Sequence, residues 1–388
     1  MVVIADRFHQ DIFSARSMIR PEARVAMVSD WFLPRLGGIE LHIADLSLEL
    51  IAAGCEVEIH STVPGPALVN GLTVHRTPAL LAHRFGFAIS PRLVNLIKRE
   101  LSQGNYDVLH AHLSIISPLS FAAIFAARQL GLPTVATFHS VLGATRLALR
   151  VTDCLSGWSR WPLALTAVSK LVADELRGAL PNADVSVLPN GVDVAYWKSV
   201  SNRTAGDDIL VVAAMRLEPR KRPIALLEAF KAAREQVNAR ARRIRLVVAG
   251  AGSQRWRMER FIAKNGLSPD VTLLGAQPRE KLRELYAGAD VFVLPSIREA
   301  FGIAALEARC AGLPVVAMYD AGPAEFLHDG ETALLAADDQ ELGRALGRVA
   351  LDDNLRAKLS RTDQSVERYA WPAVVAAHQA CYARVRKR

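Results

Sequence analysis

The chain has little of what marks secreted, membrane-spanning or metal-binding proteins. It has only four cysteines, and their wide spacing matches neither a disulfide framework nor a metal motif: Cys55, Cys154, Cys310 and Cys381. It has no run of about 20 apolar residues, so no membrane-spanning helix is expected. Charged residues interrupt residues 1–20, so we expect no signal peptide there. These absences favour reduced thiols and a cytoplasmic location.

The positive charge of the chain is unevenly placed. The formal net charge is +8, and most of the excess lies in residues 201–388. No basic stripe interleaved with aromatic residues accompanies it, so no nucleic-acid partner is expected. The charge favours solubility in general, and it also suits anionic donor phosphates or an anionic membrane surface. Peripheral attachment to the inner face of the cytoplasmic membrane therefore stays open.

Short apolar runs alternate with amphipathic stretches along the whole chain, which is typical of α/β proteins. A buried strand at Arg24–Ser29, a helix at Ile39–Ala53 and a strand at Cys55–Ser61 predict the start of a doubly wound sheet. Further strands are expected at Leu72–Arg76, Val108–Ala111, Thr134–Phe138, Leu165–Val168 and Val185–Leu188.

A second strand series follows the polar segment Ser199–Asp208, which has the composition of a linker. Its members are Ile209–Ala213, Leu246–Ala249, Val271–Leu274, Val291–Leu294 and Pro314–Ala317. We predict an N-terminal extension (1–23), a Rossmann-like domain (24–198), a second such domain (199–370) and a closing helix (371–388). Two such domains leave a cleft where the carboxyl ends of their strands face each other.

Three loops of the first domain carry candidate site residues. Gly37 and Gly38 lie between a strand and a helix, where they suit either a phosphate-binding turn or an ordinary tight turn. His110 and His112 alternate at the end of a strand and so share one face of it. No third metal ligand follows at a recognised spacing, so we favour a cleft-lining role over metal binding. His139 follows the next strand and fits a ligand contact or a structural loop histidine equally well.

Two loops of the second domain are rich in charge. Arg216 and Lys221 flank a turn after its first strand, where they could bind phosphate. The segment Pro295–Ala308 contains Glu299, and Glu307 eight residues later. A helix that begins at Ile303 would offer free amides to a diphosphate. Along a helix the two glutamates would lie about 12 Å apart, which suits one contact to a sugar and one to a ribose.

In this order and context, the five loops resemble those of the GT-B glycosyltransferases of family 4, over roughly Arg24–Arg384. The segment PNGVD at Pro189–Asp193 adds to the likeness. Within the family, the segments MVSDWFLPRLGGIELHI, HAH, FHSVLG and PSIREAFG are similar to the catalytic subunit of phosphatidylinositol N-acetylglucosaminyltransferase and its bacterial relatives.

The resemblance implies two Rossmann-like domains of GT-B type and a retaining transfer of a hexose or N-acetylhexosamine. The donor would be a nucleoside-diphosphate sugar, with UDP-sugar favoured and GDP-mannose open, and the acceptor lipid-linked or a glycan. No metal or other cofactor is expected.

The resemblance also implies roles for single residues. Arg216 and Lys221 would neutralise the departing diphosphate, Glu299 would contact the hexose, Glu307 the ribose, and His139 the transferring sugar. The remaining donor-binding candidates are Gly37, Gly38, Gly250, Phe301, Gly302 and Ile303, and His112 would lie on the acceptor side. The chain departs from the family pattern at Arg222, where glycine is common, and in the loops Gly250–Ser253 and Asp320–Glu325. These departures concern donor identity more than reaction class.

Two basic amphipathic stretches, Arg146–Leu165 and Ser90–Leu101, suit a membrane interface or a lipid-acceptor site. A core helix followed by a buried strand explains the first equally well and is slightly preferred. Two other functions also stay open: a GT-B-fold nucleotide-sugar epimerase, and a catalytically silent partner that only binds nucleotide-sugar. A dinucleotide oxidoreductase is disfavoured, because no G-x-G-x-x-G follows the first strand.

Overall fold

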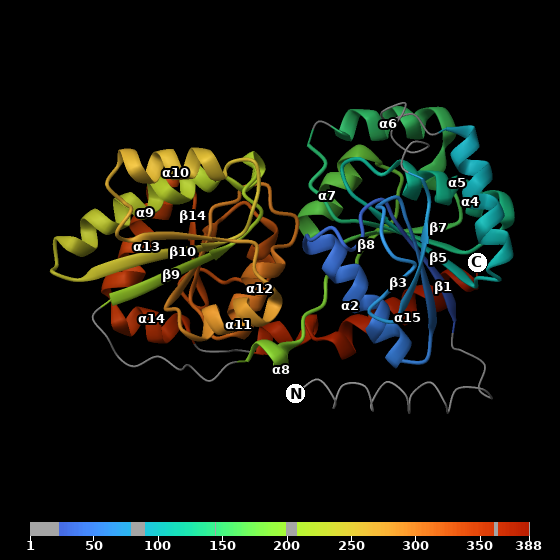
Figure 1. Ribbon diagram of the computed structural model, residues 1–388. Coiled ribbons are helices and arrows are strands. Elements are labelled where there is room, and N and C mark those ends of the chain that lie inside the picture. The colour runs from blue at the N-terminus through green and yellow to red at the C-terminus, as the bar shows by residue number, and fades with distance from the viewer. Residues whose placement is uncertain (1–22, 79–89, 144, 199–207, 361–363, 388) are drawn as a thin grey trace.

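The computed structural model describes residues 23–78, 90–143, 145–198, 208–360 and 364–387. The predicted N-terminal extension, except its last residue, and the predicted linker, except Asp208, lie outside these described residues. The described chain forms two α/β domains that lie side by side (Figure 1). The predicted α/β fold class with two Rossmann-like sheets is confirmed.

The first sheet has eight strands in the order β3-β4-β2-β1-β5-β6-β7-β8. Every neighbouring pair is parallel except β3–β4. The strands β5, β6 and β7 are buried along their whole length, as expected of parallel strands covered on both faces. The bounds are β1 Arg24–Ser29, β2 Glu56–Ser61, β3 Leu68–Val69, β4 Leu72–Arg76, β5 Val108–Leu113, β6 Thr134–Phe138, β7 Leu163–Ala167 and β8 Val185–Val187.

Helices cover both faces of this sheet. On one face α4 packs against α5, and on the other α2 packs against the last helix of the chain, α15. The bounds are α2 Gly38–Ala52, α4 Pro91–Gln103, α5 Pro118–Leu130, α6 Thr145–Ser156, η1 Trp158–Arg160, α7 Lys170–Ala179, α8 Val194–Trp197 and α15 Trp371–Arg386.

The second sheet has six parallel strands in the order β11-β10-β9-β12-β13-β14. This order places the first strand, β9, in the middle, so the chain reverses direction across the sheet between β9 and β12. The strands are β9 Asp208–Ala214, β10 Arg243–Ala249, β11 Val271–Gly275, β12 Val291–Leu294, β13 Val315–Met318 and β14 Ala333–Ala336. Its helices are η2 Pro219–Lys221, α9 Pro223–Asn238, α10 Arg255–Lys264, α11 Arg279–Ala287, α12 Ile303–Cys310, η3 Gly322–Glu325, α13 Asp339–Leu351, α14 Asp353–Leu359 and η4 Gln364–Tyr369.

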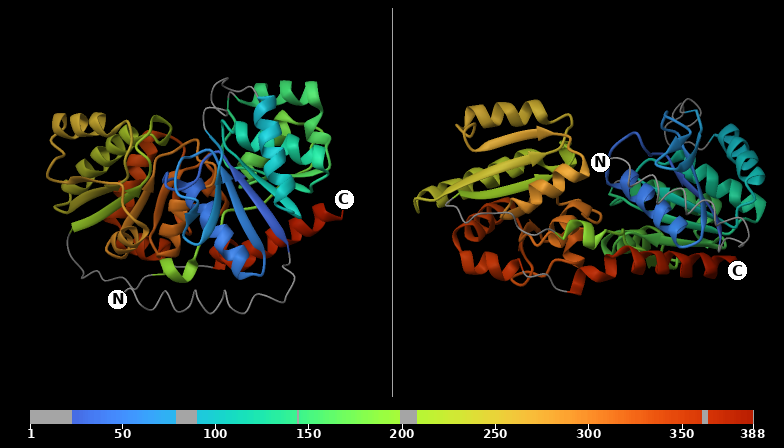
Figure 2. Two further views of the ribbon diagram at one scale, coloured as in Figure 1. Left: turned by 45° about the vertical axis from the view of Figure 1, so that its right-hand side comes forward. Right: turned by 60° about the horizontal axis from the view of Figure 1, so that its bottom comes forward.

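The chain crosses between the domains twice, and the two crossings lie side by side. The amide of Val192 donates to the carbonyl of Tyr369 at 2.8 Å. From there α15 runs back along the first domain (Figure 2), where Trp371 and Tyr382 join the core of that domain. A Cβ on Gly191 would overlap the Trp371 ring, so the first crossing packs tightly against the start of α15.

Every strand predicted from the sequence is present, with ends shifted by a few residues at most. The short strands β3 and β14 are additions to the predicted set. The stretch Arg146–Leu165 is only partly a core element, because α6 buries Leu149 alone whereas β7 is fully buried. The four cysteines are free, and only Cys154 is exposed. Within the described ranges, no helix is long and apolar enough to cross a bilayer.

Candidate active site

A cleft of about 390 Å³ lies between the two domains. It is lined by loops that follow β6 in the first sheet and β9 and β12 in the second, together with the start of α2. The β9 and β12 loops flank the point where the second sheet reverses direction, which is where doubly wound sheets bind ligands. Eight predicted site residues line this cleft: Gly38, His139, Arg216, Lys221, Glu299, Phe301, Gly302 and Ile303.

Positive charge dominates the cleft. Arg216, Arg220, Lys221 and Arg298 line it, and Glu299 is the one carboxylate among its described lining residues. The Lys221 ammonium forms an ion pair with Glu299, whose side chain is 11% exposed. Desolvation, and next the nearby Arg216, lower the pKa of the Arg220 guanidinium. Such a surplus of cations favours an anionic ligand.

The start of α12 forms a second feature suited to an anion. Gly302 precedes the helix at a φ of 86°, and a Cβ there would overlap Pro323, so only glycine fits. Ile303 and Ala304 open the helix and line the cleft. Amides in the first turn of a helix lack partners within the helix and can bind phosphate. Gly38 faces this turn from the other domain, since a Cβ on it would lie 3.6 Å from Ile303 Cδ1.

The two glutamates do not lie along one helix, which corrects the predicted geometry. Glu299 lies in the loop before α12, whereas Glu307 lies on the helix itself. Glu307 is 8% exposed and is absent from the cleft lining. Burial raises the pKa of Glu307 to about 8, opposed by Arg279 and assisted by Asp45. The Arg279–Asp45 pair, at 2.6 Å, joins α11 to α2 and thus links the two domains next to Glu307.

We predict that replacing Glu307 with Gln changes how stability depends on pH. Between its ordinary pKa near 4.5 and about 8, the folded protein holds a proton that the unfolded chain releases. Wild-type stability therefore falls as pH rises through this window, and the neutral amide removes that loss. Thermal unfolding should show Glu307→Gln gaining on the wild type between about pH 6 and pH 9. An equal difference in melting temperature between the two proteins at about pH 6 and at about pH 9 would contradict the assignment.

His112, predicted on the acceptor side, is not among the described residues that line the cleft. Its ring is 2% exposed and lies behind His139, with Nδ1 2.8 Å from His139 Nε2. His110 does share its face, at 4.1 Å between ring centroids, and is held by Tyr382 of α15 at 2.8 Å. The expected cleft-lining role of this histidine pair is therefore replaced by support of His139 from behind.

The hydrogen bonds of His112 fix the proton positions of the pair. His112 Nε2 lies 3.2 Å from Met27 Sδ, and a thioether can only accept, so Nε2 carries the proton. A neutral His112 then accepts at Nδ1 from His139 Nε2–H. Burial, and next His378, lower the pKa of His139 to about 3, so its ring is neutral. Its Nδ1 is thereby an acceptor for a ligand hydroxyl.

We predict that His112 positions His139 for turnover of the donor. His112→Leu removes the acceptor of the His139 proton and should lower kcat about tenfold with little change in donor KM. His112→Asn keeps an acceptor at the Nδ1 position and should restore most of the rate. Equal losses in both variants at matched thermal stability would show that the hydrogen bond is unimportant.

Two predicted glycines act at a distance from the cleft. Gly250 has a φ of 149°, and a Cβ on it would overlap the carbonyl oxygen of Met215, so it lets the loop bearing Arg216 pass closely. Gly37 precedes α2 in extended conformation, and a Cβ there would overlap the Glu40 carboxylate. Neither is among the described residues that line the cleft, and both fit a role in positioning the loops around it.

The unusual Arg222 has a structural explanation. Its φ of 56° is in the left-handed region that favours glycine. Its guanidinium donates to the carbonyl of Pro295 at 3.0 Å and to Asp339 Oδ1 at 2.8 Å. The bond to Pro295 holds the Lys221 loop to the loop that precedes Glu299, and the bond to Asp339 holds it to the start of α13. Together they offset the backbone cost of a non-glycine residue.

Asn190, Arg220 and Arg298 are among the cleft residues that were not predicted from the sequence. Asn190 Oδ1 is buried and has no hydrogen-bond partner among the residues described. Asn190 belongs to the PNGVD segment, which was a signal available in the sequence. Arg298 lies beside the HSVLG loop of the other domain, since a Cβ on Gly143 would be 3.1 Å from its guanidinium. That contact joins segments distant in sequence and could not be predicted.

Two doubly wound domains that face each other across a cationic cleft are the architecture of GT-B glycosyltransferases. HepE of Anabaena, solved in complex with UDP and glucose, has this fold with a TM-score of 0.74 at 18% identity, covering 93% of this chain and 99% of its own. Sucrose-phosphate synthase of Thermosynechococcus elongatus gives 0.74 at 20% identity, with 93% and 98% covered.

The chain is a glycosyltransferase and belongs to family 4 of these enzymes. Residues 36–196 match the model for Glycosyltransferase Family 4, and residues 198–365 match that for glycosyl transferases group 1. A phosphatidylinositol N-acetylglucosaminyltransferase subunit from Arabidopsis thaliana is 30% identical, over 85% of this chain and 74% of its own length. D-inositol 3-phosphate glycosyltransferase of Stackebrandtia nassauensis is 30% identical over 88% and 86%.

Proposed function

We propose that this enzyme transfers a hexose or N-acetylhexosamine from a UDP-sugar to a lipid-linked or glycan acceptor, with retention of configuration. The observation that carries the proposal is the meeting of Arg216, Lys221 and the first amides of α12 in one cleft, opposite His139. Structures of HepE with UDP and with UDP-glucose support UDP over GDP, and GDP-mannose is the alternative donor. The relatives named for phosphatidylinositol and for inositol 3-phosphate support a polar headgroup or glycan hydroxyl as acceptor.

On donor binding, Lys221 and Glu299 would separate from each other, and each would bind a group of the donor. Its diphosphate binds the amides of Ile303 and Ala304 and takes over Lys221. Glu299, released from Lys221, accepts hydrogen bonds from hydroxyls of the donor sugar. The ribose contact expected of Glu307 requires the bound donor to reach that buried side chain outside the described cleft lining. His139 Nδ1 accepts from a further sugar hydroxyl.

The reaction then needs no nucleophile from the protein. The bond from the anomeric carbon to the phosphate oxygen breaks, and the acceptor oxygen bonds to that carbon on the same face. The acceptor proton passes to the departing phosphate, whose charge Arg216 and Lys221 stabilise. Because these cations already neutralise the leaving group, the proposal requires no metal ion.

Two alternative functions are an epimerase and a catalytically silent binding partner. An epimerase would change the sugar without an acceptor, and a silent partner would bind donor without turnover; neither finds support among the relatives described above. We place the reaction in the cytoplasm, at the inner face of the cytoplasmic membrane if the acceptor is a lipid.

Nucleotide binding gives the first test. UDP should raise the melting temperature more than GDP or ADP does, because ligand that binds only the folded state stabilises it.

The anomeric configuration of the transferred sugar, followed by NMR, should match that of the donor. Absence of a shift with every nucleotide would contradict the site, and an inverted product would contradict retention.

Substitution of the ion pair gives the second test. Lys221→Ala and Glu299→Ala should each lower donor turnover about 100-fold or more, because each removes a contact to the donor. Both variants should fold, with a lower melting temperature because the remaining partner is left buried and unpaired. The matched controls Lys264→Ala and Glu331→Ala change exposed residues and should keep full activity. Near-normal turnover in both cleft variants would overturn the site.

A further inference from the structure

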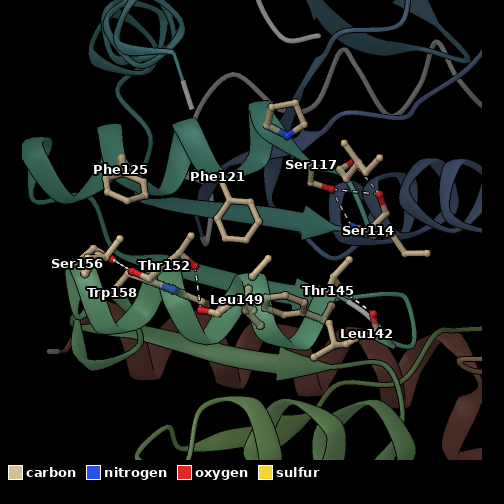
Figure 3. Close-up of a pocket in the computed structure, with 16 residues that line it drawn as sticks. Ser114, Ser117, Phe121, Phe125, Leu142, Thr145, Leu149, Thr152, Ser156 and Trp158 are labelled. Carbon is tan, nitrogen blue, oxygen red and sulfur yellow. Dashed lines mark hydrogen bonds between the residues drawn. The ribbon is translucent and has the colours of Figure 1, made fainter. Parts of the chain in front are cut away.

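A groove of about 280 Å³ runs between α5 and α6 of the first domain. Figure 3 shows Phe121 and Phe125 projecting from α5 toward Leu149 and Thr152 on α6. Trp158, which is 1% exposed, also lines the groove. No charged side chain is among the lining residues that the structure describes. The lining is therefore suited to an apolar ligand.

The few hydroxyl groups in the lining are already satisfied locally. Thr145 Oγ1 donates to the carbonyl of Leu142 at 2.6 Å, and Thr152 Oγ1 donates to that of Leu149 at 2.8 Å. Ser156 Oγ donates to the carbonyl of Thr152 at 2.7 Å. Because these groups are paired within their own helix or turn, they offer little recognition to a sugar or a phosphate. A hydrocarbon chain has no hydrogen-bonding groups and therefore needs no polar partner in the lining.

The groove continues into the catalytic cleft. Ile115, Leu142 and Thr145 line both. Leu142 lies three residues after His139 in the same loop, so one end of the groove opens beside the proposed transfer site. Figure 3 shows Leu142 and Thr145 at this end, and Phe125 and Ser156 at the other. A chain lying in the groove would hold a headgroup at the cleft.

The rim of the groove is also apolar. Ile115, Ile116 and Leu155, which line the groove, are 45%, 40% and 84% exposed. They lie on α6 and on the loop before α5, and α6 buries only Leu149. Exposed apolar side chains gathered at one place mark a surface that meets lipid or a partner.

We propose that this groove binds the hydrocarbon chain of a lipid acceptor and so sets its reactive hydroxyl beside His139. The inference rests on the proposed function and narrows the acceptor from a lipid or glycan to a lipid. Chain length then becomes a determinant of specificity, because each further buried methylene strengthens binding until the groove is full.

The test uses hexyl, octyl and decyl β-glucosides as monomeric probes, titrated by calorimetry in the presence of UDP. Affinity for the wild type should rise roughly tenfold from hexyl to octyl and again from octyl to decyl. Ala148→Trp places a bulky ring in the groove from an exposed lining position of α6, and should abolish the dependence on chain length. Val151→Trp introduces the same ring on the same helix outside the lining and should behave as wild type.

The outcomes separate this inference from the proposed function. UDP binding without any chain-length dependence in the wild type, or with an unchanged dependence in Ala148→Trp, overturns the groove alone. Failure of the wild type to bind UDP overturns the proposed function. Thr152→Trp fills the groove from a second exposed position and replaces Ala148→Trp if that variant does not fold.

Discussion

The ion pair between Lys221 and Glu299 lies where four cationic side chains and one carboxylate of the described lining share a cleft. This surplus of positive charge lowers the stability of the fold when no anion is bound. Contacts around the cleft nevertheless hold the cationic side chains in place. Arg222, bonded to Asp339, holds the Lys221 loop in place, and Gly302 lets α12 point its first amides at the same space. The diphosphate of the proposed donor would satisfy these groups together, which a neutral ligand would not.

The first-domain side of the cleft is supported by buried, neutral histidines and not by charged side chains. His139 is supported by His112, and His110 behind it is bonded to Tyr382. Tyr382 belongs to α15, which reaches the first domain only after the chain has completed the second. The last helix therefore contacts the histidines behind His139 and so supports the first-domain wall of the cleft.

The sequence predicted the sheets well, because buried parallel strands appear as short apolar runs. Four strands, among them Thr134–Phe138, match their predicted bounds to the residue. Positions set by distant packing could not be predicted. The burial of His112 depends on contacts with Met27 of β1 and with His139, which follows β6. The role of Gly250 depends on the close approach of the Met215 backbone. The predicted helix start at Ile303 matches α12, so the helical spacing assumed for the two glutamates was wrong because Glu299 precedes that start. The groove between α5 and α6 could not be predicted either, because the pattern of one amphipathic helix does not show how closely a second helix packs against it.

The most direct test of this account is a crystal structure of the enzyme with UDP. We predict that the diphosphate contacts the amides of Ile303 and Ala304, and that Lys221 has left Glu299 for a phosphate oxygen. A diphosphate bound elsewhere, or one bound in the cleft while the Lys221–Glu299 pair stays intact, would contradict the central claim that this cleft holds the donor through that exchange.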